Sequence, residues 1–141
     1  MGTWTKHNKE REKKLTKHIR ITMSLIYHLA PASRWYSWPD ELPYLPAEYD
    51  REGFIHCTSG DELMIKVANQ YYRNVPGDYL LLVIDMTKLK NPPSPIKWEE
   101  SSVFRLPFPH IYGPIDRQAI VEVRTIQRSD DGTFVGWTKS D

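Results

Sequence analysis

The sequence predicts an α+β domain in which about six short strands form a curved mixed or antiparallel sheet around one main helix. Two observations indicate this class. Short runs of β-branched and aromatic residues are separated by turn residues, and only one segment has a solid helical pattern. The length of 141 residues suits a single core, and 40% hydrophobic with 26% charged residues is typical of a soluble globular protein.

The first 23 residues differ from the rest of the chain in charge. They hold seven basic and two acidic residues, a net charge of +5, whereas the remainder holds twelve basic and sixteen acidic residues, a net charge of −4. Because apolar residues are few, we expect residues 1–23 to be a basic tail that is disordered or a frayed helix, followed by one domain over 24–141. Ser24 suits the position after an initiator methionine. We therefore also expect that residues 1–22 are either an appendage or no part of the natural protein, with translation starting at Met23.

The composition indicates the cellular compartment of the protein and argues against a membrane protein. Cys57 is the only cysteine, so an internal disulfide is impossible, and small buried cysteines are commoner than reactive ones. No apolar run approaches the roughly 18 residues of a membrane span. We expect a soluble, cytoplasmic protein without a membrane partner. RNA is a possible partner that the composition does not indicate, because the basic tail lacks the interleaved aromatic side chains of a single-strand binding groove.

The first predicted strand covers 23–30, where the composition switches abruptly to strand formers. Side chains alternate along a strand, so Ile26, His28 and Ala30 are expected on one face. The segment that follows, up to Gly53, is broken by prolines and rich in aromatic residues. We expect short helical turns there, in a stretch that either walls a ligand pocket or fills an ordinary core.

The main helix is predicted over 60–73, with Leu63, Val67 and Tyr71 at four-residue steps forming its buried stripe. The apolar run 79–84 predicts a central strand that is covered on both faces. The remaining predicted elements are helical turns at 32–35 and 47–51, strands or extended segments at 96–99, 103–108 and 119–124, and a hairpin turn at 130–132 before a short edge strand at 134–137.

The stretch from Gly53 to Ser59 joins a turn glycine, a short strand and a helix start around one histidine. Ser59 and Glu62 fit a capping box that opens the helix. His56 is therefore expected near the carboxyl end of a strand, just before a helix amino terminus, where free backbone N–H groups favour an anion. For this reason we interpret Thr58 and Ser59 as ligand-binding residues. The alternative is a structural histidine that only binds the backbone, and this stretch alone favours that alternative.

Three histidine-centred blocks stand in order along the chain: Ile-Tyr-His-Leu at 26–29, Gly-Phe-Ile-His-Cys-Thr at 53–58, and Phe-Pro-His-Ile-Tyr-Gly-Pro at 108–114. Together they resemble the domain-of-unknown-function 952 family, over roughly residues 25 to 123. The resemblance implies a fold like that of the ADP-ribosyltransferases, a split sheet with a nicotinamide-nucleotide cleft. It also implies NAD as a possible substrate, but no proven activity.

The resemblance gives one histidine a specific role. His28 resembles the strand histidine that, in the histidine-tyrosine-glutamate branch of those enzymes, hydrogen-bonds the nicotinamide-side ribose. That branch also needs a late carboxylate, whereas the late block here offers His110 and Tyr112. Glu99 and Glu100 are nearby acidic residues, and neither aligns with the catalytic glutamate. A second relative by fold, the RNA 2'-phosphotransferase group, uses histidine and arginines instead, which this chain also has.

We predict that His28, His56 and His110 converge on one cleft as catalytic residues that donate hydrogen bonds to a ribose or phosphate and shuttle protons. Arg34 and Arg105 are candidate phosphate-binding residues, and Tyr112 a further ligand-binding residue. Two other interpretations stay open. Each histidine can be a tether for a loop, and three histidines can bind zinc, although no local ligand spacing supports this and we expect no bound metal.

Two classes of function follow from these residues. The first is an enzyme, for example a transferase of the ADP-ribosyltransferase-like group, that binds NAD, another nucleotide or an RNA phosphate and transfers or hydrolyses it. The second is a non-catalytic domain that binds a nucleotide-like ligand or a protein. A late glutamate that faces the cleft would favour the enzyme.

Overall fold

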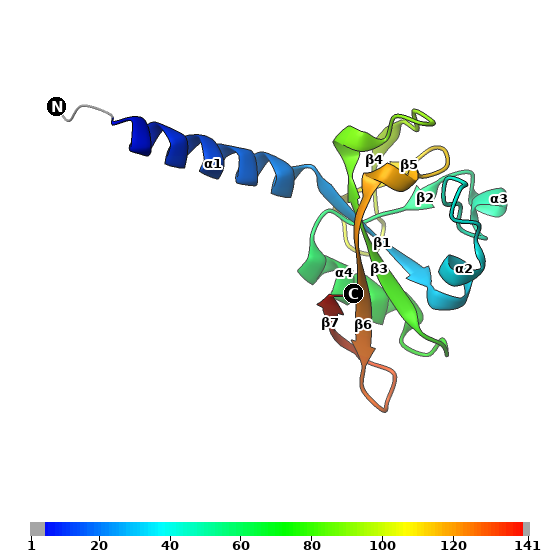
Figure 1. The fold of residues 1–141 in the computed structure, drawn as a ribbon. Helices are drawn as coiled ribbons and strands as arrows, with labels where there is room; N and C mark the ends of the chain where they lie inside the picture. The colour runs from blue at the N-terminus through cyan, green and yellow to red at the C-terminus, as the bar shows by residue number, and fades with distance from the viewer. Residues whose placement is uncertain (1–4, 140–141) are drawn as a thin grey trace.

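Two antiparallel sheets form the body in a computed structural model that describes residues 5–139, apart from the side chains of residues 18–22 and 139. In the larger sheet the strand order is β1-β3-β6-β7, and in the smaller one it is β2-β5-β4 (Figure 1). The strands are β1 (Leu25–Pro31), β2 (Ile55–His56), β3 (Tyr79–Asp85), β4 (Ile96–Glu100), β5 (Pro107–Ile111), β6 (Ile120–Arg128) and β7 (Phe134–Lys139). The α+β class is confirmed. Every strand pair is antiparallel, and the described residues form seven strands rather than about six.

Four α-helices and two 3-10 turns complete the described part of the chain. They are α1 (Lys6–Met23), α2 (Ala32–Ser37), α3 (Tyr49–Glu52), α4 (Asp61–Tyr72), η1 (Met86–Lys88) and η2 (Arg117–Ala119). The predicted helical turns before and after the proline-rich segment correspond to α2 and α3, and the predicted main helix is α4. None of the helices in residues 5–139 combines the length and the apolar character that crossing a membrane requires.

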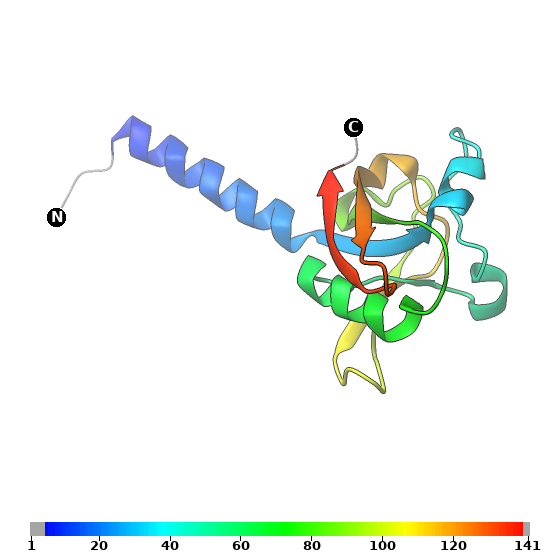
Figure 2. The same ribbon diagram turned by 90° about the horizontal axis from the view of Figure 1, so that it is seen from below.

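The alternation of side chains along β1 and β3 creates an apolar core on each face of the larger sheet. On one face, Ile26 and Ala30 belong to a cluster with Tyr44 and residues of the smaller sheet such as Ile55 and Ile111. On the opposite face, the side chains pack against α4, which lies along the sheet in Figure 2. They are Tyr27, Leu29, Tyr79, Leu81 and Val83. The prediction of a central strand covered on both faces is therefore confirmed for β3.

Two details of the prediction for α4 are wrong. The helix buries Met64 and Ala68, whereas Tyr71 of the predicted stripe is 50% exposed. Packing against the sheet sets the rotation of the helix about its axis, and rotation by one residue moves the buried face by about 100°. The capping box is also not formed, because the chain stays extended through Gly60, which takes the N-cap position without a side-chain cap bond. Ser59 thus lies one residue before the N-cap position, so its side chain does not cap the helix.

The segment predicted to be extended over 103–108 is largely the tip of a hairpin between β4 and β5. The strand β5 begins only at Pro107, and the backbone of Arg105 has a positive φ of 54°. The amide N–H of Arg105 donates to the carbonyl of Ser101 at 2.8 Å, which closes the turn. This tip borders the cavity described below.

The basic amino-terminal segment is a helix that projects away from the body in both views (Figures 1 and 2). All side chains described from Thr5 to Lys17 are exposed. The structure thus gives a helix where the sequence predicts disorder or a frayed helix. The division of the chain at residue 23 stays a prediction.

Candidate functional site

A cavity of about 980 Å³ lies where β1, α3, α4 and the smaller sheet meet. His28 from β1, His56 from β2 and His110 from β5 all line it. The histidines are 28 and 54 residues apart in sequence, and the topology brings them together because β2 pairs with β5 and residue 58 bridges to β1. The three histidines that the sequence predicts to converge therefore share one cavity, while their chemical roles stay predictions.

His28 is 2% exposed and is held in one orientation by the backbone of the neighbouring segment. Its Nδ1–H donates to the carbonyl oxygen of His56 at 2.7 Å. A carbonyl can only accept, so the proton is on Nδ1, and Nε2 of the neutral ring carries a lone pair. Nε2 is buried and has no hydrogen-bond partner among the described residues. Burial lowers the pKa of His28, so the ring is neutral at neutral pH.

His56 and Glu52 form a pair at the exposed side of the cavity. The Nε2–H of His56 donates to Oε2 of Glu52, and 54% of the His56 side chain is exposed. This hydrogen bond is the largest cause that lowers the pKa of Glu52. Because Glu52 holds the proton on Nε2, the lone pair of the neutral ring is on Nδ1.

His110, Glu99 and Tyr112 form a second hydrogen-bonded group. One carboxylate oxygen of Glu99 accepts from the Nδ1–H of His110 at 3.0 Å and also from the hydroxyl of Tyr112. These two bonds, the Tyr112 bond first, lower the pKa of Glu99, and the same bond raises the pKa of Tyr112. Glu99 is therefore an ionised carboxylate at neutral pH, and it leaves Nε2 of a neutral His110 with its lone pair.

The two histidine–carboxylate pairs meet because His56 and His110 are direct cross-strand partners on β2 and β5. Their ring centroids are 5.0 Å apart and nearly perpendicular, at 79°. Phe54 packs against both rings, stacked on His110 at 4.3 Å and edge-on to His56 at 4.7 Å. The side chains thus fix two imidazoles, each oriented by a carboxylate, beside one another. This arrangement suits proton transfer to or from a bound molecule.

The ionisable groups of the cavity are mostly acidic. Five carboxylates line it, and Arg51 provides the only guanidinium among the described lining residues. The carboxylates belong to Glu48, Asp50, Glu52, Glu99 and Glu100. The electrostatic character therefore favours a positively charged group over an anion.

Most of the residues predicted to bind a phosphate lie elsewhere. Arg34 donates twice to the carbonyl of Leu45, at 3.1 and 2.8 Å, and stacks over the ring of Trp38, so it tethers a loop. Arg105 is exposed at the hairpin tip and Ser59 is exposed beyond the strand, and neither lines the cavity. Thr58 does line it, and Tyr112 reaches it only through its bond to Glu99.

Cys57 is 3% exposed and burial strongly raises the pKa of its thiol, which agrees with the prediction of a buried, unreactive cysteine. Within residues 5–139, and apart from the undescribed side chains, no group of three or more His, Cys, Asp or Glu residues is arranged to hold a metal ion. The expected lack of bound metal stays a prediction.

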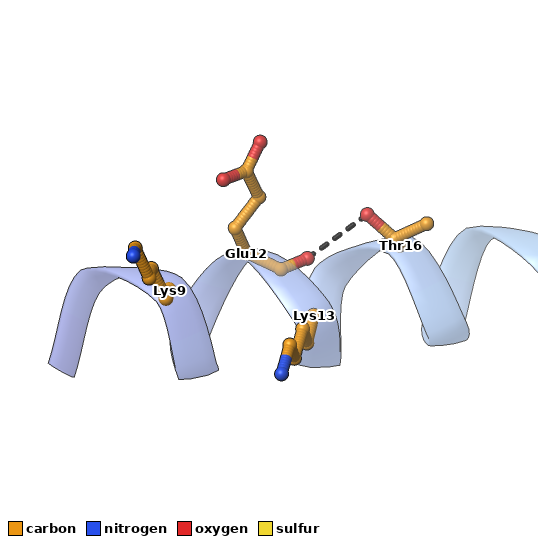
Figure 3. Close-up of a pocket in the computed structure, with 4 residues that line it drawn as sticks. All are labelled: Lys9, Glu12, Lys13 and Thr16. Carbon is orange, nitrogen blue, oxygen red and sulfur yellow. Dashed lines mark hydrogen bonds between the residues drawn. The ribbon is translucent and has the colours of Figure 1, made fainter. Parts of the chain in front are cut away.

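A second hollow lies beside α1 and is lined by Lys9, Glu12, Lys13 and Thr16 (Figure 3). All four residues are exposed on one isolated helix, and the Thr16 hydroxyl donates to the Glu12 carbonyl at 2.9 Å. All four lining residues belong to α1. It is a gap between solvated side chains rather than a ligand site.

The sequence pattern does not single out three carboxylates of the cavity, those of Glu48, Asp50 and Glu52. All three precede the Gly53 block, in the segment whose prolines and aromatic residues are its most evident features. A weak signal existed for Glu52, which precedes His56 by four residues. The turn at Gly53, whose φ is +79°, folds the chain back and makes this pair meet.

Comparisons with known proteins agree with this architecture. A family model described as "Protein of unknown function (DUF952)" matches residues 29–123. Two X-ray structures of protein CC0527 from Caulobacter crescentus, one of them a double mutant, match with a TM-score of 0.63 at 23% and 22% identity. Each match covers 79% of this chain and 93% of that chain, and at this identity the likeness shows the fold alone. A search of the curated proteins finds no match.

Proposed function

The chain belongs to the DUF952 family of proteins of unknown function, and we propose that its histidine cavity binds NAD and cleaves the bond between the ribose and the nicotinamide ring. The ADP-ribosyltransferase-like fold is part of this proposal, and the two small antiparallel sheets are compatible with it. The observation that carries the proposal is the convergence of His28, His56 and His110 with Glu99 in one cavity.

The position of Glu99 favours an enzyme over a non-catalytic binding domain. A late carboxylate facing the cleft distinguishes the two classes, and Glu99 lines the cavity with its carboxylate fixed by His110 and Tyr112. Binding alone does not need two imidazoles that are each oriented by a carboxylate. General acid–base chemistry does, because the carboxylate selects the tautomer that can accept a proton.

The charge of the cavity favours cleavage at the ribose over chemistry at a phosphate. Cleavage of a bond between an anomeric carbon and its leaving group passes through a transition state with positive charge on the sugar ring. Carboxylates stabilise such a charge, whereas they repel the equatorial oxygens of a transferring phosphoryl group. Because Arg34 and Arg105 lie outside the cavity, Arg51 is the only guanidinium among its described lining residues, which is less favourable for phosphoryl transfer than a cluster of cations.

Two of the histidines have roles that their geometry allows. The Nε2 lone pair of His28 accepts a hydrogen bond from a ribose hydroxyl. Nδ1 of His56, whose other nitrogen bonds Glu52, takes the proton of an attacking water or acceptor hydroxyl. In the hydrolytic reaction the water oxygen bonds the anomeric carbon, the carbon–nitrogen bond breaks, and its electron pair leaves with nicotinamide, which becomes neutral.

The test is the release of nicotinamide from NAD, measured by liquid chromatography. We expect release by the wild-type protein and at least about a hundredfold slower release by His56→Gln or Glu99→Gln, which is typical for loss of an acid–base or electrostatic group. Glu62→Gln, on the exposed face of α4, is the matched control with unchanged rate. NAD binding without release would instead establish the non-catalytic alternative, and a lack of both would contradict the proposal.

A further inference from the structure

Glu48 differs from the other carboxylates of the cavity. Glu52 is bonded to His56 and Glu99 to His110 and Tyr112, while Asp50 and Glu100 are exposed to solvent. Glu48, by contrast, lines the cavity half-buried, and its carboxylate has no hydrogen bond or ion pair with a described residue, although its backbone carbonyl accepts from the amides of Arg51 and Glu52. A carboxylate that faces a cavity and has no partner in the protein can pair with a cationic group of a bound molecule.

The neighbouring polar atoms point to a ligand independently. His28 is 2% exposed and Tyr44 is fully buried, and both His28 Nε2 and the Tyr44 hydroxyl are buried without a hydrogen-bond partner. The rings of His28 and Tyr44 are 6.2 Å apart. Buried polar groups in folded proteins almost always have partners. Of these two residues only His28 lines the cavity, so its unpartnered Nε2 indicates where a bound molecule provides a partner.

Two tyrosine residues line the same cavity. They are Tyr72 and Tyr79, whose ring centroids are 5.4 Å apart. Burial raises the pKa of Tyr72, and the negative charge of Glu48 adds to the increase. Burial also raises the pKa of Tyr44 to about 12, with Glu48 as the next cause. Glu48 thus exerts its charge among neutral phenol rings, which is a favourable surrounding for a planar cation.

We propose that Glu48, Tyr72 and Tyr79 form a subsite for the cationic aromatic ring of the ligand, next to the ribose-binding Nε2 of His28. This inference rests on the proposed function, because the nicotinamide ring of oxidised NAD is such a cation and the ring of NADH is neutral. The attraction between a carboxylate and a ring cation is largest where water is displaced. Glu48 therefore discriminates between the two forms by charge, and it loses its cationic partner when nicotinamide leaves as a neutral molecule.

Calorimetric titration of the full chain with two pairs of ligands tests the subsite. The first pair is NAD, whose ring is cationic, and NADH, whose ring is neutral. The second pair lacks the nucleotide and consists of cationic 1-methylnicotinamide and neutral nicotinamide. We expect the wild-type protein to prefer the cationic member of each pair, and Glu48→Gln to weaken the binding of that member by about tenfold or more. Binding of the neutral member should change by less than about twofold. Glu41→Gln, an exposed residue of the same segment outside the cavity, is the matched control.

The result distinguishes this inference from the proposed function. Cleavage of NAD together with an unchanged cation preference in Glu48→Gln would overturn the subsite and leave the reaction in place. A preference for 1-methylnicotinamide that depends on Glu48, found without NAD cleavage, would support the subsite and overturn the reaction. If Glu48→Gln weakened the binding of the cationic and the neutral member of a pair equally, Glu48 would act on the fold and the subsite would be overturned. A wild-type protein that does not prefer the cationic member would also overturn it.

Discussion

The Nδ1–H of His28 donates a 2.7 Å hydrogen bond to the carbonyl oxygen of His56, and this bond joins the larger sheet to the smaller one. Beside it, Tyr27 and Thr58 exchange two backbone hydrogen bonds of 2.8 Å. His28 thus holds the segment that carries a second histidine of the cavity. Its other nitrogen, Nε2, is buried without a partner among the described residues, so this structural bond does not use the atom that the proposed function assigns to a ligand.

The buried ring of His28 predicts a specific pH dependence of stability. Burial lowers the pKa of His28 below the ordinary histidine value of about 6.5, whereas the backbone bond to His56 and the charge of Glu48 oppose the shift. Below that value the unfolded chain binds a proton that the folded chain does not bind, so the free energy of unfolding falls as pH decreases. Between about pH 7.5 and about pH 5.5 this loss amounts to at most about 1.4 kcal/mol.

His28→Asn is the control for this prediction, because asparagine keeps an N–H donor for the carbonyl of His56 and does not titrate. Urea unfolding at both pH values measures the difference. The groups facing His28, namely Tyr44, Glu48 and His56, are the same in both proteins. If the free energy of unfolding fell by the same amount between the two pH values in the wild-type protein and in His28→Asn, His28 would not be the cause of the pH dependence.

Gly113, which belongs to the late histidine block, should not tolerate a side chain. Its φ of +150° is unfavourable for other residues, and a Cβ there would overlap the Oγ of Ser94, which donates to the carbonyl of Pro114 at 2.6 Å. We expect Gly113→Ala to lower the free energy of unfolding by about 2 kcal/mol or more. Gly60→Ala is the matched control with a loss below about 1 kcal/mol, because the nearest atom, Leu63 Cβ, is 3.9 Å from the added Cβ. If chemical denaturation showed equal decreases in the free energy of unfolding for Gly113→Ala and Gly60→Ala, the role given to Gly113 would be contradicted.

Arg128 is expected to be the most important surface cation for stability. Its guanidinium donates to the carbonyls of Tyr72, Arg73, Gly77 and Gly132 at 2.8 to 3.2 Å. These bonds satisfy the end of α4 and join it to the β6–β7 hairpin, so Arg128→Met should cost about 2 to 4 kcal/mol. Arg73→Gln, which breaks an exposed pair with Asp131, should cost less than about 1 kcal/mol. Denaturant unfolding with no difference between the variants would refute this ranking.

Removal of residues 1–22 should leave the stability of the body unchanged. The described side chains of α1 up to Lys17 are exposed, so the deletion removes no core contact that they make. We expect the free energy of unfolding of a chain beginning at Met23 to stay within about 0.5 kcal/mol of the full-length value. A larger decrease in thermal or chemical unfolding would show that the helix packs against the body.

The sequence was sufficient where local pattern decides the structure. The alternation along β1, the apolar run of β3 and the turn at Gly132 each specify their element, and the three histidine blocks predicted one shared cavity. It was insufficient where packing decides. The rotation of α4, which buries Met64 instead of Tyr71, depends on the sheet beneath it.

The same limit explains which site residues were missed. Glu48 and Glu52 reach the cavity because the chain turns back at Gly53, and Arg34 leaves it because the carbonyl of Leu45 lies within reach. Neither the turn at Gly53 nor the Arg34–Leu45 contact follows from a helical or strand periodicity in the sequence. A charged side chain does not reveal its partner until the fold brings distant segments together.

The most direct test of the central claim, that the three cavity histidines form one ligand site, is a nuclear magnetic resonance titration of the ring nitrogens in histidine-labelled protein with NAD. We predict that the signals of His28, His56 and His110 shift together with a single dissociation constant, while the signal of His7 on the exposed helix α1 stays in place. The lone-pair nitrogen of His28 should shift most, because it gains a hydrogen bond inside the cavity. Signals of the three cavity histidines that remain unchanged at saturating NAD, or that shift no more than the signal of His7, would contradict the account.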